Sequence, residues 1–134
     1  MERLRQRLLV AHEALSSLQE ILQKSSVSLV ERDAAIQRFE YTVEAVWRAA
    51  QRHLEVVEGL SAGSPKAATR LCREAGLLDD DQATQALEMV DDRNLTVHTY
   101  NEQIAQRIYG NLPRYAALME QWLKRMEARL EKGA

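Results

Sequence analysis

The residues best suited to chemistry lie in one short window of the sequence, "RNLTVHTY" at 93–100. The guanidinium of Arg93 can bind a phosphate through two parallel hydrogen bonds, and the imidazole of His98, with a reference pKa near ~6.5, can exchange a proton at neutral pH. On a continuous helix, residues at this spacing point about 140° away from each other. Arg93 and His98 can therefore act on one phosphate only if the helix ends between them.

A turn at this place is indicated by the residues that follow. Thr99 and Glu102 have the spacing of a capping box, which predicts that a new helix begins directly after His98. The side chains of Arg93 and His98 can then converge, and Tyr100, one residue into the new helix, would point to the same place. The alternative is that Arg93 and His98 balance the dipole at a helix C-terminus, and the spacing alone does not decide between the two.

The elements that must position this window are predicted to be helices. Residues 2–24 carry one apolar stripe with alternating spacings of four and three. A capping box at Ser28 and Glu31 begins a second helix, whose stripe continues to Gly59. About 30 helical residues would span roughly 45 Å, which is longer than a compact bundle of this size needs. We therefore expect the second helix to pack against a partner chain.

Shorter helices are predicted in the following part of the chain. Ser64, Pro65 and Gly76 have the positions of an N-cap, a first helical residue and a residue just past the helix end. The run 79–81, three aspartates, is expected to cap the next helix, because negative charge is favoured at a helix N-terminus. The residues expected on the inner side of that helix are Ala83, Leu87, Val90 and Val97.

The last helix is expected to begin after His98, to be interrupted near Gly110 and Pro113, and to run on to about Lys132. Together these elements predict an all-α fold, an antiparallel up-and-down bundle of four main helices with short extra helices, in a single domain over 1–134. The composition agrees, because 46% hydrophobic and 28% charged residues are ordinary for a globular protein, and five glycines and two prolines are few for a turn-rich β fold.

Several classes of site are excluded by residues that are missing. The glycines are scattered, so the sequence has no phosphate-binding or dinucleotide-binding loop. No histidine follows a glutamate at the spacing of a di-iron bundle, and Cys72 has no second cysteine as a zinc ligand. We therefore expect neither a metal nor a cofactor. The aspartates at 79–81 are interpreted as a helix cap, since consecutive helical residues point about 100° apart.

Composition also limits the location and the partners. The single cysteine, Cys72, cannot form an internal disulfide, which fits a reducing cytoplasm. No stretch approaches ~20 apolar residues, and the start "MERLRQRLLV" is too short and too quickly polar for a secretory signal, so we expect a cytoplasmic protein without a membrane segment. The net charge of −2 gives no general attraction to nucleic acid, so any contact with RNA must be local.

Three further ionisable residues lie on the predicted second helix. His53 has a core position in the apolar stripe, and we interpret it as a histidine whose hydrogen bonds are satisfied inside the bundle or at an interface. Glu40 and Glu44 either orient Arg93 or His98 or are simply solvated, and we favour solvation.

The window "RNLTVHTY" resembles the signature of the HEPN family, in which an arginine, a polar residue, three further residues, a histidine, a spacer and a tyrosine follow one another. Its surroundings, "GLLDDDQATQALEMVDDRNLTVHTYNEQIAQRIY", and the segment "RFEYTVEAVWR" at 38–48 resemble the branch labelled nucleotidyltransferase substrate-binding proteins. The resemblance covers nearly the whole chain. It implies a helical bundle that dimerises through its long helices and brings two Arg/His motifs into one cleft.

The resemblance also implies a function. Similar proteins are metal-independent endoribonucleases that serve as toxins in type VII-like toxin–antitoxin pairs, and a separately encoded minimal nucleotidyltransferase neutralises them. Arg93 and His98 would be catalytic, with Asn94 as the polar residue beside Arg93, and Tyr100 matches the tyrosine that the transferase modifies with AMP. Gly63-Ser64 and the aspartates at 79–81 are interpreted as helix ends and not as the Mg²⁺ site of a transferase, so we expect the chain to be the partner of the transferase and not the transferase itself. Because the family also contains inactive members, the alternative is a non-catalytic subunit that docks a nucleotidyltransferase or presents its substrate.

The expected chemistry needs no metal, since RNA carries its own nucleophile, the 2′-hydroxyl. His98 would accept the proton of this hydroxyl, and Arg93 would stabilise the charge that builds on the phosphate. The His98 of a second copy would protonate the leaving 5′-oxygen. The products would carry 2′,3′-cyclic phosphates, and the partners would be a second copy of the chain, the transferase and RNA.

Overall fold

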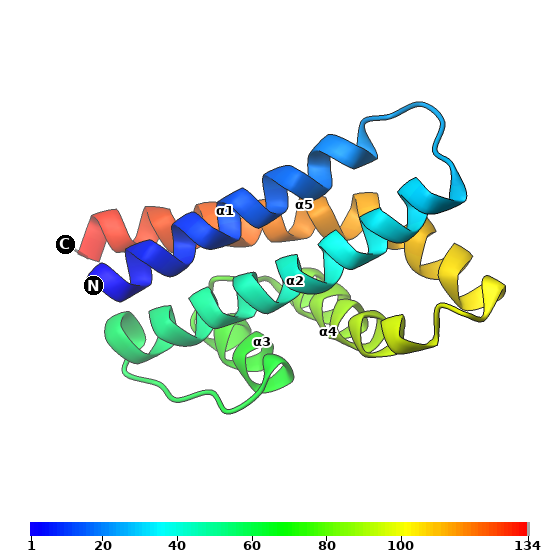
Figure 1. Ribbon diagram of the computed structural model, residues 1–134. Helices are drawn as coiled ribbons and strands as arrows, with labels where there is room; N and C mark the ends of the chain where they lie inside the picture. Colours follow the sequence, from blue (N-terminus) through cyan, green and yellow to red (C-terminus); the bar gives the residue numbers. More distant parts are fainter. Residues whose placement is uncertain (134) are drawn as a thin grey trace.

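The computed structural model describes residues 1–133, and every statement below concerns that part of the chain. Helices α1 (Glu2–Leu22) and α2 (Leu29–His53) run antiparallel and contact each other along their length (Figure 1). Helix α5 (Glu102–Gly133) packs against both, while α3 (Pro65–Glu74) and α4 (Asp80–Asn94) pack on the other side of α2. Residues 1–133 contain no β-strand, so the predicted all-α antiparallel bundle is confirmed. None of these helices has both the length and the apolar content that crossing a membrane requires.

The predicted apolar stripes form the core of the bundle. On α1 the stripe residues from Leu4 to Leu18 are at most 5% exposed. On α2 the buried positions continue as far as His53, which is fully buried as expected from its place in the stripe, but neither ring nitrogen has a hydrogen-bond partner among the described residues. The chain then keeps its helical direction through a π-helical turn, Leu54–Glu58, and the helix ends at Gly59, whose φ is 70°. The long second helix predicted from the sequence is therefore present, with a wider winding in its last turn.

Several predicted helix ends are found where the sequence places them. Ser28 accepts a hydrogen bond from the Glu31 amide, and the Glu31 carboxylate returns to the Ser28 amide, so this capping box is confirmed. Ser64 caps α3, and Gly76 follows that helix with φ 81°, a conformation that favours glycine. Asp79 caps α4 by accepting from the amide of Gln82, as expected for the first of the three aspartates.

The predicted capping box at Thr99 is wrong. The Thr99 hydroxyl donates to the carbonyl of Thr96, and the cap of α5 is Asn101, whose side-chain oxygen accepts from the amides of residues 103 and 104. Asn101 is the N-cap in place of Thr99 because its short carboxamide reaches two free amides of the first turn at once. Glu102 then points to another helix, and Tyr100 lies in the turn before α5 and not inside it.

Two expectations for the later helices are also wrong. Helix α5 is not interrupted at Gly110 and Pro113, because the apolar residues on both sides are buried and the continuous helix keeps them in the core. Pro113 lacks the amide hydrogen of a normal turn, and the helix bends in this region (Figure 1). Val97 was expected to face inward and is 73% exposed. It belongs to a 3₁₀ turn, Leu95–His98, in which the α-helical spacing no longer applies and Thr96 is buried instead.

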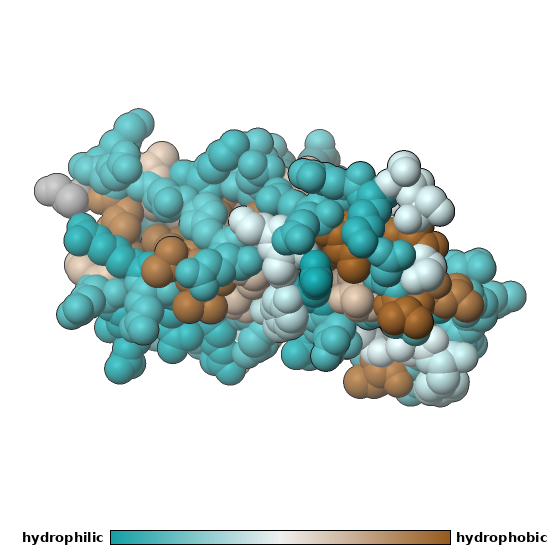
Figure 2. Space-filling model, turned by 45° about the horizontal axis from the view of Figure 1, so that its top comes forward, coloured by the Kyte–Doolittle hydropathy of each residue, from teal (hydrophilic) through white to brown (hydrophobic). Residues whose placement is uncertain are grey.

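One face of the bundle is mainly polar. Figure 2 shows hydrophilic side chains over most of one face, with hydrophobic side chains gathered in a few separate patches. Large apolar side chains that remain exposed on the first two helices are Leu9, Val10, Leu29, Val30 and Tyr41. Dimerisation through the long helices stays a prediction.

Candidate functional site

Arg93 lies in the last turn of α4 and faces α2. Its Nη2 atom is 3.9 Å from Oε2 of Glu44, and both side chains are about 40% exposed (40% and 42%). Glu44 is therefore not simply solvated, and the interpretation favoured from the sequence is corrected for this residue. Glu40, one turn earlier on α2, is partly buried and has no hydrogen bond or ion pair within residues 1–133.

Glu44 is held as an anion by two further donors. The indole Nε1 of Trp47 donates to Oε2 at 2.8 Å, and Nε of Arg48 donates to Oε1 at 3.0 Å. Partial burial opposes ionisation of this carboxyl, but the two hydrogen bonds and the charges of Arg48 and Arg93 outweigh it, so the pKa of Glu44 is lowered. A fixed carboxylate of this kind can orient the Arg93 guanidinium.

His98 and Tyr100 form a second contact on the exposed turn between α4 and α5. The Nδ1 atom of His98 is 3.0 Å from the hydroxyl of Tyr100, and the rings meet edge to face with centroids 5.6 Å apart. Tyr100 is 83% exposed, so its hydroxyl is accessible to a large partner. The carbonyl of His98 accepts from the amide of Asn101 at 3.0 Å, which fixes the turn that carries both rings.

The predicted site residues thus lie together on one short segment, in two separate contacts. Helix α4 ends at Asn94, one residue after Arg93, and the chain passes into the 3₁₀ turn that ends at His98. Asn94 is exposed and forms no side-chain hydrogen bond with the described residues. Arg93 and His98 are not bonded to each other within residues 1–133. That these two side chains act on one ligand stays a prediction.

A buried carboxylate beside Arg93 was missed from the sequence. Asp92 is 4% exposed and accepts hydrogen bonds from Arg107 at 2.5 Å, Asn111 at 3.1 Å and the hydroxyl of Tyr115 at 2.7 Å. The three donors are one turn apart on α5, and this i, i+4, i+8 row of polar residues was the signal that could have revealed the network. Burial and the Asp92 carboxylate raise the pKa of Tyr115, so the phenol remains a donor.

A second anchor fixes the other end of the segment. The guanidinium of Arg32, with a side chain only 11% exposed, donates to both carboxylate oxygens of Glu102 at 2.5 and 3.2 Å. These hydrogen bonds lower the pKa of Glu102 and raise that of Arg32. Residues 93–101 are therefore held between two polar anchors, Asp92 bound to α5 and Glu102 bound to α2, which position the exposed rings without covering them.

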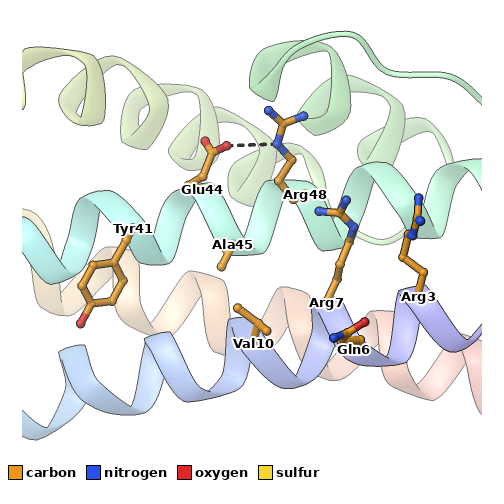
Figure 3. A pocket seen from close by; sticks show the side chains of 8 residues that line it. All are labelled: Arg3, Gln6, Arg7, Val10, Tyr41, Glu44, Ala45 and Arg48. Atoms are coloured by element: carbon orange, nitrogen blue, oxygen red, sulfur yellow. Dashed lines mark hydrogen bonds and ion pairs between the residues drawn. The ribbon is translucent and has the colours of Figure 1, made fainter.

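A groove between α1 and α2 adjoins this site. It has a volume of about 680 Å³, and Glu44 belongs both to its wall and to the Arg93 pair. Figure 3 shows the arginines of the groove toward one end and Tyr41 at the other. The side chains that line the groove are Arg3, Gln6, Arg7, Val10, Tyr41, Glu44, Ala45 and Arg48. Residues 1–133 contain no group of three or more His, Cys, Asp or Glu side chains that could hold a metal ion.

Comparison with protein families gives a match over most of the chain. The sequence model of the family described as "Nucleotidyltransferase substrate binding protein like" matches residues 6–128 of the chain. A comparison with curated proteins finds no match.

Several solved structures share the fold. The crystal structure of ttk003001694 from Thermus thermophilus is 58% identical in sequence, with a TM-score of 0.85, covering 87% of this chain and 98% of that one. A mutant of the toxin–antitoxin MntA-HpeT is 16% identical, with a TM-score of 0.80 and coverage of 96% and 99%. HI0074 from Haemophilus influenzae, described as a substrate binding domain of a nucleotidyltransferase, is 24% identical, with a TM-score of 0.71 and coverage of 90% and 98%.

Proposed function

The chain belongs to the nucleotidyltransferase substrate binding protein like family, and from this premise we propose that it is a HEPN-type, metal-independent endoribonuclease. In this proposal the protein acts as the toxin of a toxin–antitoxin pair, and a partner minimal nucleotidyltransferase neutralises it. Support comes from the fold shared with the toxin–antitoxin MntA-HpeT and from the Arg93/His98 motif. The observation that carries the proposal is the arrangement of Arg93, His98 and Tyr100 on one exposed, anchored segment.

RNA cleavage would use His98 as the base. When Nδ1–H donates to the Tyr100 oxygen, Nε2 carries the lone pair and accepts the proton of the RNA 2′-hydroxyl. The 2′-oxygen then attacks the phosphorus, the bond to the 5′-oxygen breaks, and the imidazolium of a second His98 protonates that oxygen. The strand then ends in a 2′,3′-cyclic phosphate, and the step requires neither water nor a metal ion.

Arg93 would bind the phosphate on which the charge builds. Its guanidinium presents two parallel N–H donors, a geometry that suits two oxygens of a phosphate. Glu44 fixes the direction of the side chain in the free protein, and its ion pair is long enough, at 3.9 Å, for a phosphate to compete for Arg93. The second His98 comes from the predicted homodimer, so cleavage requires two copies of the chain.

Neutralisation would be a covalent modification of Tyr100. The tyrosine oxygen attacks the α-phosphorus of ATP bound to the transferase, pyrophosphate leaves, and the phenolic proton passes to solvent, or to His98 Nδ1 in the tautomer that carries its hydrogen on Nε2. The new phosphodiester replaces the hydrogen bond between Tyr100 and His98 and places a nucleotide over the motif. RNA is then excluded by the bulk of the nucleotide and by its phosphate, which competes for Arg93.

A second function is favoured by a different observation. The description of the matched family, and that of the Haemophilus influenzae structure, name substrate binding for a nucleotidyltransferase. In that case the chain is a non-catalytic subunit that docks the transferase. Tyr100 then contacts the transferase or is modified by it, and the modification does not inhibit a ribonuclease.

Cleavage of RNA in the presence of EDTA separates the two functions. The ribonuclease proposal expects cleavage by the wild-type protein and loss of cleavage in Arg93→Ala and His98→Ala. Arg70→Ala and His12→Ala are matched controls, because they remove the same charge or ring from exposed and half-exposed positions outside the motif. If the wild type leaves RNA intact while still binding the transferase, the docking function is correct and the ribonuclease proposal is wrong.

A further inference from the structure

The groove between α1 and α2 carries an excess of positive charge on a chain that is negative overall. Three arginines and one glutamate line it, whereas the whole protein has a net charge of −2. Arg3 and Arg7 lie one turn apart on α1 and form no ion pair with any side chain of residues 1–133. The groove therefore offers a local attraction for anions that the total charge does not reveal.

The one acidic residue of the groove is already neutralised. Glu44 accepts from Arg48 and also contacts Arg93, so its charge is shared between two guanidinium groups. The guanidinium of Arg48 is itself held over the Trp47 ring, 4.2 Å from its centroid. An anion that enters the groove thus meets Arg3, Arg7 and a fixed Arg48 without facing an unpaired carboxylate.

The other end of the groove offers a different contact. Tyr41 is 46% exposed, and its hydroxyl is 2.8 Å from the hydroxyl of Ser17 on α1. This hydrogen bond fixes the ring beside the groove, while Val10 and Ala45 add apolar wall. Other proteins bind single-stranded nucleic acid with this combination, in which a cationic groove binds the backbone and an aromatic ring stacks on a base.

We propose that the groove between α1 and α2 binds the phosphodiester backbone of single-stranded RNA and guides the strand to the Arg93/His98 motif. Arg3 and Arg7 bind successive phosphates, Arg48 binds near the point where the groove meets Glu44, and Tyr41 stacks on one base. Continuity with the motif is given by Glu44, which lies in the groove wall and contacts Arg93. The inference rests on the proposed function, since it names the substrate path of that site.

The test measures binding and not cleavage. A labelled single-stranded RNA of 12 nucleotides is titrated with the His98→Ala protein, and with the same protein carrying Arg3→Gln and Arg7→Gln, at several KCl concentrations. Loss of two phosphate contacts reduces the slope of log K against log [salt] by about 1.4 and weakens binding roughly tenfold at low salt. The matched control is Arg5→Gln with Arg70→Gln, which removes the same charge outside the groove and leaves both values unchanged.

The outcomes distinguish the inference from the proposed function. If the wild type cleaves RNA through Arg93 and His98 but the Arg3/Arg7 variant binds with an unchanged slope, the groove inference is wrong and the ribonuclease stands. If RNA is bound with the expected slope change but never cleaved, the groove inference stands and the ribonuclease proposal is wrong. A variant that sediments as a monomer, where wild type and control are dimers, would show that the groove holds a second copy, which also overturns the inference.

Discussion

Replacing Asp92 with alanine should destabilise the bundle at the place where α4 meets α5. The carboxylate is 4% exposed and accepts from Arg107, Asn111 and Tyr115. Tyr115 is 1% exposed, so its hydroxyl cannot return to water, and an unpaired buried hydroxyl costs about 1–3 kcal/mol. Arg107 is 56% exposed and can be solvated again, so its share is about 0–1 kcal/mol.

The sum of these contributions gives the expected magnitude. With about 1 kcal/mol for the hydrogen bond to Asn111, and about 0.5 kcal/mol regained from the helix propensity of alanine, Asp92→Ala should lower the free energy of unfolding by about 3 kcal/mol. For a domain of this size that corresponds to a fall in Tm of roughly 12 °C. Urea unfolding followed by circular dichroism at 222 nm measures the change.

A neighbouring variant and a double-mutant cycle test the reasoning. Asp91→Ala removes the adjacent carboxylate, which is 58% exposed and pairs with Lys66, and should cost less than about 1 kcal/mol. Tyr115→Phe removes the hydroxyl that Asp92→Ala leaves unpaired, so the double variant should be less destabilised than the sum of the single variants by about 1–2 kcal/mol. Equal costs for Asp91→Ala and Asp92→Ala, or strict additivity in the cycle, would refute the buried-network argument.

Three further predictions concern single residues. Cys72 is fully buried, and burial raises the pKa of its thiol to about 12. Ellman's reagent at pH 8 should therefore label the thiol in urea and not in the native protein, and rapid labelling of the native protein would contradict this. His53 is fully buried, and its pKa is lowered from 6.5 mainly by burial. The unfolded chain therefore binds more protons than the folded chain, and the free energy of unfolding should fall as the pH drops below about 6.5. His53→Leu should flatten this fall between pH 7.5 and 5.5, and equal slopes of the free energy of unfolding against pH in both proteins would refute the prediction. Tyr100→Phe removes the hydrogen-bond partner of His98 Nδ1 but leaves Nε2 as the base, so it should still cleave RNA, more slowly than the wild type, and should gain no AMP on co-expression with the transferase, as read by mass spectrometry of the peptide. Efficient neutralisation of this variant would show inhibition by binding alone.

The helical stripes and most caps could be predicted because each depends on residues within one or two turns. The buried face of α1 follows from a spacing of three and four, and the ends marked by Ser28, Ser64 and Asp79 follow from side chains that reach their own first turn. The end of the helix between Arg93 and His98 could also be predicted, although the cap expected at Thr99 is formed by Asn101 and Tyr100 lies before α5 and not inside it.

The remaining features depend on contacts between distant parts of the chain. Glu102 was assigned to a local cap, but Arg32, 70 residues away in sequence, binds it and leaves the cap to Asn101. Pro113 was expected to interrupt the last helix, but burial of the residues around it keeps α5 continuous. The pairing of Arg93 with Glu44, like the Asp92 network, joins elements that only the packed bundle brings together.

The central claim is that Arg93 and His98 cleave RNA without a metal. The most direct measurement is an analysis of the 3′ ends produced from a short labelled RNA in EDTA by the wild-type protein, with His98→Ala and Arg93→Ala purified in parallel. Metal-independent cleavage by these two residues predicts 2′,3′-cyclic phosphate ends from the wild type and none above background from either variant. Ends of another kind, or equal cleavage by wild type and His98→Ala, would contradict it.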